Sequence, residues 1–211
     1  MITACGPIQH PSANVQVAIQ ETEKVAKIGL RCGLAGGLIW FAMGTESVLR
    51  PFQDNRRETF WLLPFLLTII TLVCVHLIQR RRSRIESVGF AAVVIASALM
   101  LVGNVGLQLT VTWLEVLGAP AGPLIWLVGL LCFGIGTLKA GLLPRSVGWA
   151  LIFFEPSSVL AAFMLSPIAP MLPRGAYSGN VGKGVALAIL AFGLRRFRTR
   201  DANDAGTAQV S

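Results

Sequence analysis

Six apolar runs take up most of this chain, and they constrain its fold more than any other feature of the sequence. The hydrocarbon core of a bilayer is about 30 Å thick, so a helix needs about 20 mostly apolar residues to cross it. The sequence therefore predicts an all-α fold, a polytopic membrane helix bundle with six transmembrane helices. The predicted crossings are 25–48, 59–78, 85–117, 124–138, 146–165 and 176–194.

The composition agrees with this class. Only 13% of the residues are charged and the mean hydropathy is +0.68, whereas soluble domains average about 25% charged residues. The net charge of +8 comes from basic residues that flank the apolar runs, which membrane topology explains better than nucleic acid does. We therefore expect the lipid bilayer as a partner, no nucleic acid, and no second, soluble domain.

The basic residues also predict an orientation. With both termini in the cytoplasm, thirteen of the 18 Lys and Arg residues lie on the inner side, as the positive-inside rule requires. They are Lys24, Lys27, Arg31, Arg80, Arg81, Arg82, Arg84, Lys139, Arg145, Arg195, Arg196, Arg198 and Arg200. We expect a plasma-membrane protein with a flexible N-terminal arm (1–24), a six-helix transmembrane domain (25–195) and a disordered, basic-then-polar tail (196–211).

A carboxylate, Glu155, interrupts the fifth run. A charge at the centre of a bilayer costs at least ~2.5 kcal/mol on insertion scales, so it needs a partner, and Lys183 in the sixth run is the candidate. At ~1.5 Å per residue, the two lie ~15 and ~18 Å from the basic ends of their runs. We predict a buried ion pair. Pro156 should also kink the helix and free the carbonyl of Ile152 for Lys183 or Ser157.

Polar residues in the third run recur at helical spacing. The intervals of 7, 4, 4 and 3 residues place Ser97, Asn104, Gln108, Thr112 and Glu115 on one stripe of a helix. This stripe has two interpretations, hydrogen bonding between helices or the wall of an outward-facing cavity.

Glycines recur every third or fourth residue in two of the runs. They are Gly29, Gly33 and Gly37 in the first run, and Gly175, Gly179 and Gly182 at the start of the last, with Gly175 directly before it. Small residues at this spacing let helix backbones approach closely in lipid. The faces predict tight packing within the chain or, alternatively, contact with a second copy or with another membrane protein.

The turn at 141–149 carries one resemblance. Its pattern Gly-x-Leu-Pro-Arg-x-x-Gly-Trp resembles a turn found between two apolar spans in uncharacterised bacterial multi-pass membrane proteins of about six helices. The resemblance implies a bacterial origin and a fold, but no activity.

The residues needed for most active sites are missing from the runs. None contains an aspartate, the chain has only two histidines, and His76 beside the arginines is interpreted as an interfacial residue. We expect no metal ion and no cofactor. A structural or accessory membrane subunit is the favoured function, and a small transporter or proton-coupled carrier is the alternative. An intramembrane enzyme that uses Glu155 and Lys183 as acid and base is a third.

Overall fold

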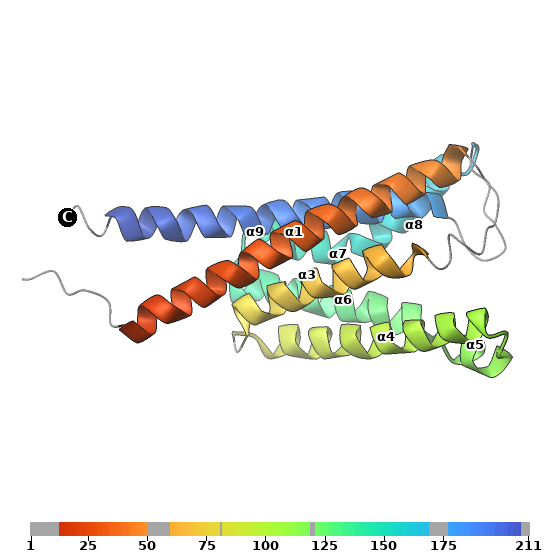
Figure 1. Cartoon of the computed structure of the whole chain (residues 1–211), viewed down its shortest axis with the longest axis horizontal. Coiled ribbons are helices and arrows are strands. Elements are labelled where there is room, and N and C mark those ends of the chain that lie inside the picture. Colours follow the sequence, from red (N-terminus) through yellow and green to blue (C-terminus); the bar gives the residue numbers. More distant parts are fainter. Residues whose placement is uncertain (1–12, 50–59, 81, 119–120, 169–176, 208–211) are drawn as a thin grey trace, which may run out of the picture.

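The structure is a computed structural model that describes residues 13–49, 60–80, 82–118, 121–168 and 177–207 (Figure 1). Every element within these ranges is a helix, which confirms the predicted all-α class. The elements are α1 (Ala13–Leu49), α3 (Leu62–Gln79), α4 (Arg84–Gln108), α5 (Thr112–Gly118), α6 (Ala121–Ala140), α7 (Arg145–Ile152), α8 (Phe154–Leu165), the 3₁₀ turn η1 (Tyr177–Gly179) and α9 (Asn180–Thr207).

The described helices are compatible with a membrane. Four stretches are long and apolar enough to cross one, and there are five if the bent pair α7–α8 counts as a single crossing. α9 is not among them, because Lys183, Arg195 and Arg196 limit its uncharged stretch to 184–194. Large apolar side chains also cover the outside of the bundle, as lipid contact requires. Leu38, for example, is 71% exposed.

Two helix pairs form the sides of the bundle. The second half of α1 packs on the first half of α9, α4 packs on α6, and α3 lies between the pairs (Figure 1). The glycine face of α1 makes the first pairing close: a Cβ at Gly33 would lie 2.9 Å from the Ala191 Cβ, and one at Gly37 would lie 3.0 Å from the Gly184 carbonyl oxygen. This face is therefore covered by the chain's own helices and is not open to a second copy.

The predicted third crossing is not one helix. α4 ends at Gln108, and α5 folds back against it. Thr110 has φ 56°, and the amides of Thr110 and Val111 donate to the carbonyls of Leu107 (3.3 Å) and Gly106 (2.8 Å), the two hydrogen bonds of a Schellman motif. A Cβ at Gly118 would lie 2.6 Å from the Leu99 carbonyl oxygen, so glycine permits the tight return.

Several predicted boundaries also differ. α1 begins at Ala13, so the second half of the predicted N-terminal arm is helical, and α9 continues to Thr207 through most of the predicted disordered tail. α6 begins at Ala121 instead of Leu124, because Pro123 fits the first turn of a helix, where its missing N–H loses no bond. Gly175 lies outside the described residues.

The predicted kink at Pro156 is present. α7 ends at Ile152, α8 begins at Phe154, and the two axes differ by 56°. The proline ring would collide with the carbonyl of Ile152 in a straight helix, and the missing N–H removes the bond to that carbonyl. The bend falls directly beside Glu155 and sets its direction toward the bundle.

Candidate functional site: an ion pair in an aromatic box

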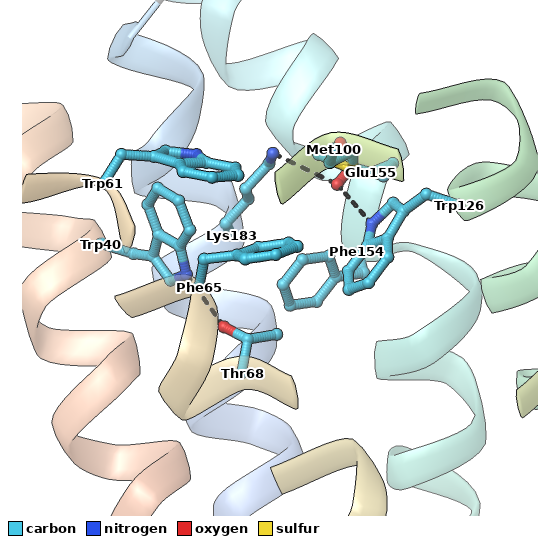
Figure 2. A pocket seen from close by; sticks show the side chains of 9 residues that line it. All are labelled: Trp40, Trp61, Phe65, Thr68, Met100, Trp126, Phe154, Glu155 and Lys183. Atoms are coloured by element: carbon cyan, nitrogen blue, oxygen red, sulfur yellow. Dashed lines mark hydrogen bonds and ion pairs between the residues drawn. The ribbon is translucent and has the colours of Figure 1, made fainter. Parts of the chain in front are cut away.

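Glu155 on α8 and Lys183 on α9 point toward each other. Lys183 Nζ lies 3.2 Å from Glu155 Oε1, and the two side chains are 17% and 19% exposed, respectively (Figure 2). The structure thus brings together the two charges that the sequence paired. They belong to consecutive long segments of the chain whose helices pack directly.

Glycines of α9 determine how closely these two helices approach. A Cβ at Gly179 would lie 2.6 Å from the carbonyl oxygen of Ser158, and one at Gly182 would collide with the carbonyl of Ser157. Because the backbones touch here, Lys183 stands within one turn of the contact and reaches Glu155 without crossing lipid. The predicted small-residue face of the last run therefore positions the ion pair.

Two tryptophans also contact the pair. Trp126 Nε1 on α6 donates to Glu155 Oε1 at 2.9 Å. Lys183 Nζ lies 5.5 Å from the centre of the Trp40 ring, within the range of a cation–π interaction. Trp40 Nε1 in turn donates to Thr68 Oγ1 at 3.0 Å. The carboxylate thus has two charged or polar donors, and the ammonium faces a carboxylate and a ring.

Five rings, which we call the aromatic box, surround these groups (Figure 2). They are Trp40, Trp61, Phe65, Trp126 and Phe154. Successive rings touch, with centroids 4.4 Å apart between Trp61 and Phe65 and 5.5 Å between Phe65 and Trp126. The space left inside is about 10 Å³, roughly that of one water molecule. The box is filled by Lys183 itself.

The carbonyl freed by Pro156 is not bound as expected. Ser157 Oγ donates to the carbonyl of Phe154 at 3.0 Å and not to that of Ile152, and Lys183 Nζ is directed at the carboxylate. Ser157 lies in the first turn of α8, and a serine hydroxyl in a helix reaches a carbonyl three or four residues earlier. For Ser157 that carbonyl is the one of Phe154, and Ile152 is five residues away.

The predicted polar stripe is divided by the break in the third run. Ser97 is buried and its hydroxyl donates to the Val93 carbonyl at 2.7 Å, while Asn104 is half-buried and Gln108 is exposed at the end of α4. Thr112 and Glu115 belong to α5, where Thr112 is exposed and Glu115 is half-buried. The five residues therefore do not form one helical face.

A second buried carboxylate was missed by the sequence reasoning. Glu86, in the first turn of α4, is 0% exposed, and its Oε1 lies 2.6 Å from His76 Nδ1 at the end of α3. His76 also stacks on Phe90, with centroids 4.0 Å apart. Nearby, Gln79 Nε2 donates to Thr137 Oγ1 of α6 at 2.7 Å. His76 is thus a partner of a buried acid and not only an interfacial residue.

One signal in the sequence could have found Glu86. Ser83 and Glu86 have the spacing of a capping box, and Ser83 Oγ accepts from the Glu86 amide at 3.4 Å. This pattern begins α4 at Arg84, only five residues after α3 ends at Gln79. In a tight helical hairpin the last turn of one helix faces the first turn of the next, which places His76 opposite Glu86.

Comparison with family models, with curated proteins and with solved structures finds no match. The resemblance of the 141–149 turn therefore stays a prediction. In the structure this turn joins α6 to α7: Gly141 has φ 67°, the left-handed region that glycine adopts readily, and Pro144 is the residue before α7.

Proposed function

We propose that the chain crosses the plasma membrane six times, with both termini in the cytoplasm. The support for the sixth crossing is the packing of α9 on α1. A Cβ at Gly29 would touch Leu194 at 2.8 Å and one at Gly44 would touch Val181 at 2.7 Å, so the two helices run antiparallel over the same depth. If α1 crosses the bilayer, α9 must cross beside it. The excess of basic residues at one end supports the orientation.

For the role of the protein, we propose a structural or accessory membrane subunit whose buried charges fix the arrangement of its helices. The observation that carries this proposal is that Glu155 is held by two partners in a narrow site. Lys183 and Trp126 bind its carboxylate, and the aromatic box leaves room for about one water. Buried ion pairs are expensive to desolvate and are best attested as devices that specify register.

The core between the two carboxylate sites supports the same role. Leu72, Val75, Leu130 and Phe133 lie in α3 and α6 between the box and the His76–Glu86 pair, and none is more than 1% exposed. Two buried hydroxyls in the same stretch of α3, those of Thr68 and Thr71, donate to carbonyls of their own helix, so the contact between α3 and α6 here is mainly apolar packing. The bundle therefore has the features of a scaffold.

A proton-coupled carrier remains the second candidate because of one feature, the 56° bend beside Glu155. Discontinuous helices with a carboxylate near the middle of the membrane are typical of secondary transporters. In this alternative the box would open by motion of α8 relative to α9, and Glu155 would exchange its partner.

Cysteine accessibility tests the two roles without knowledge of a substrate. In a variant whose native cysteines are replaced by alanine or serine, Met100→Cys places a thiol in the lining of the box. A scaffold protects this thiol from a membrane-impermeant methanethiosulfonate added on either side of the membrane, whereas a carrier exposes it on at least one side. Gln108→Cys, at the exposed end of α4, is the control that should react.

The proposed orientation has its own test. Green fluorescent protein fused after Ser211 should fluoresce in cells, and alkaline phosphatase at the same place should be inactive. The reverse pattern would contradict the cytoplasmic C-terminus.

A further inference from the structure

A groove of about 600 Å³ runs along the outside of the bundle between the bent pair α7–α8 and α9. Small residues form its floor, since Ala150 and Ala186 are only 5% and 4% exposed. Large apolar side chains form its walls, including Trp149 and Leu160 on one side and Ile189 on the other, each at least 44% exposed. The shape is that of a narrow apolar groove that is open along one side.

The bend accounts for the groove. α9 touches α7 where a Cβ at Gly193 would collide with Val147, and it touches α8 where Gly179 and Gly182 meet Ser157 and Ser158. Between these two contacts the axis changes direction by 56°, so α7 and α8 cannot both follow α9 closely. The gap between the contacts is wide enough for a chain of methylene groups, and its volume lies in the usual range for small-molecule sites, ~300–1,000 Å³.

One end of the groove is basic. Ser146 lines that end, and Arg145, which is exposed, precedes it at the start of α7. A Cβ at Gly193 of α9 would lie 3.6 Å from Ser146 Oγ, so this part of α9 lies at the same end, and the exposed Arg195 and Arg196 follow Gly193 within one turn. The start of α7 and the basic part of α9 therefore meet beside a hydroxyl at one end of an otherwise apolar groove.

We propose that this groove binds a phospholipid with an anionic head group. One acyl chain lies along the groove between α7–α8 and α9, and the phosphate lies at Arg145, Ser146 and Arg195. The acyl chain covers the exposed apolar walls of the groove. The guanidinium groups match a phosphate in charge and geometry. The proposal rests on the proposed membrane crossing, but not on the role of the ion pair.

The test measures which lipid stays bound to the purified full-length protein. The protein in dodecyl maltoside receives dioleoyl phosphatidylglycerol or dioleoyl phosphatidylcholine at equal molar ratios, and native mass spectrometry counts the retained lipid. We expect at least fivefold more phosphatidylglycerol than phosphatidylcholine. The preference should disappear in the double variant Arg145→Gln, Arg195→Gln and persist in the control Arg84→Gln, an exposed arginine of α4 away from the groove.

A second variant tests the acyl-chain part of the site. Ala161→Phe fills the groove from α8 and should reduce retention of both lipids at least fivefold, whereas Ala91→Phe, on the exposed face of α4, should not. If the two groove variants and their two controls all retained the same amount of each lipid, the lipid would form a nonspecific shell, and the proposal would be overturned. A shift from dimer to monomer caused only by Ala161→Phe would also overturn it, since it would assign the groove to a second copy. Extraction of the protein from membranes by alkaline carbonate would instead refute the membrane crossing itself.

Discussion

His76 Nδ1 lies 2.6 Å from Glu86 Oε1, so a buried acid ties the end of α3 to the first turn of α4. The side chain of Glu86 is 0% exposed and that of His76 is 17% exposed, so loss of the histidine should destabilise the fold more than loss of the acid. Loss of the histidine leaves a carboxylate buried with Ser87 Oγ, 3.2 Å away, as its remaining side-chain donor among the described residues. Loss of the acid leaves an imidazole that still reaches water.

This asymmetry gives the first prediction. His76→Phe keeps a ring to stack on Phe90 but should lower the stability by about 3 kcal/mol, because it leaves a buried charge without its partner. Glu86→Gln should cost less, about 1 kcal/mol, because an amide oxygen can still accept a hydrogen bond. Thermal midpoints in detergent, read by size-exclusion fluorescence, measure both. A larger loss for Glu86→Gln would contradict this account, and the exposed Glu21→Gln serves as the control.

The second prediction concerns Glu155 and Lys183. Glu155→Gln and Lys183→Met should each lower the amount of folded protein, with a cost of roughly 2–4 kcal/mol, because each leaves one charge buried without the other. The double variant removes both charges and should recover much of the loss. The same detergent assay gives the coupling energy of the double-mutant cycle. Strictly additive losses would show that the two charges are not partners, and Lys139→Met at an exposed position controls for loss of a lysine.

Trp126 supplies the third prediction. Trp126→Phe keeps a buried ring but removes the N–H that donates to Glu155 Oε1 at 2.9 Å, and a hydrogen bond to a charged group contributes about 1.5–3 kcal/mol. The thermal midpoint should therefore fall, and it should fall less when Glu155 is already glutamine. Trp113→Phe, at a residue that is 68% exposed, should leave the midpoint nearly unchanged. Equal effects of the two substitutions would argue against the hydrogen bond.

The ion pair could be predicted from the sequence because its physical requirement is strict. A charge inside an apolar run must find a partner at the same depth, and Lys183 was the only cation at that depth in the neighbouring run. The aromatic box could not be predicted, since the pattern of an apolar run identifies a tryptophan only as a large apolar or interfacial residue. Its role depends on which helices meet, and α1, α3 and α6 come together around the pair only in three dimensions.

The break after α4 shows a different limit. Helix ends are usually signalled by glycine or proline, and the residues at the break, Leu109, Thr110 and Val111, include neither. The apolar pattern therefore continues through 85–117 as if one helix crossed the membrane. The fold ends the helix through the return of α5 onto α4, which is made possible by Gly103, Gly106 and Gly118, none of them at the turn itself. Tertiary contact outweighs the local pattern here.

The unusual backbone of Thr110 leads to the fourth prediction. A β-branched residue at φ 56° is strained, and the Schellman position it occupies normally holds glycine. Thr110→Gly should therefore raise the thermal midpoint, by about 1 kcal/mol in stability. Thr112→Gly, at the start of α5 and without a positive φ, should be neutral or destabilising. No gain from Thr110→Gly would mean that the chain does not reverse at this residue.

The last prediction concerns the contact that holds the ion pair in place. A Cβ at Gly182 would collide with the carbonyl of Ser157, which is backbone and cannot move aside without separating α8 from α9. Gly182→Ala should therefore lower the stability by about 2 kcal/mol and weaken the coupling between Glu155 and Lys183 in the double-mutant cycle. Gly36→Ala is the matched control, because the two atoms nearest to its new Cβ, Leu187 Cδ2 and Leu67 Cβ at 3.0 Å, belong to side chains and not to a backbone carbonyl. If Gly182→Ala lowered stability but left the coupling energy intact, the glycine would be a packing residue without influence on the pair.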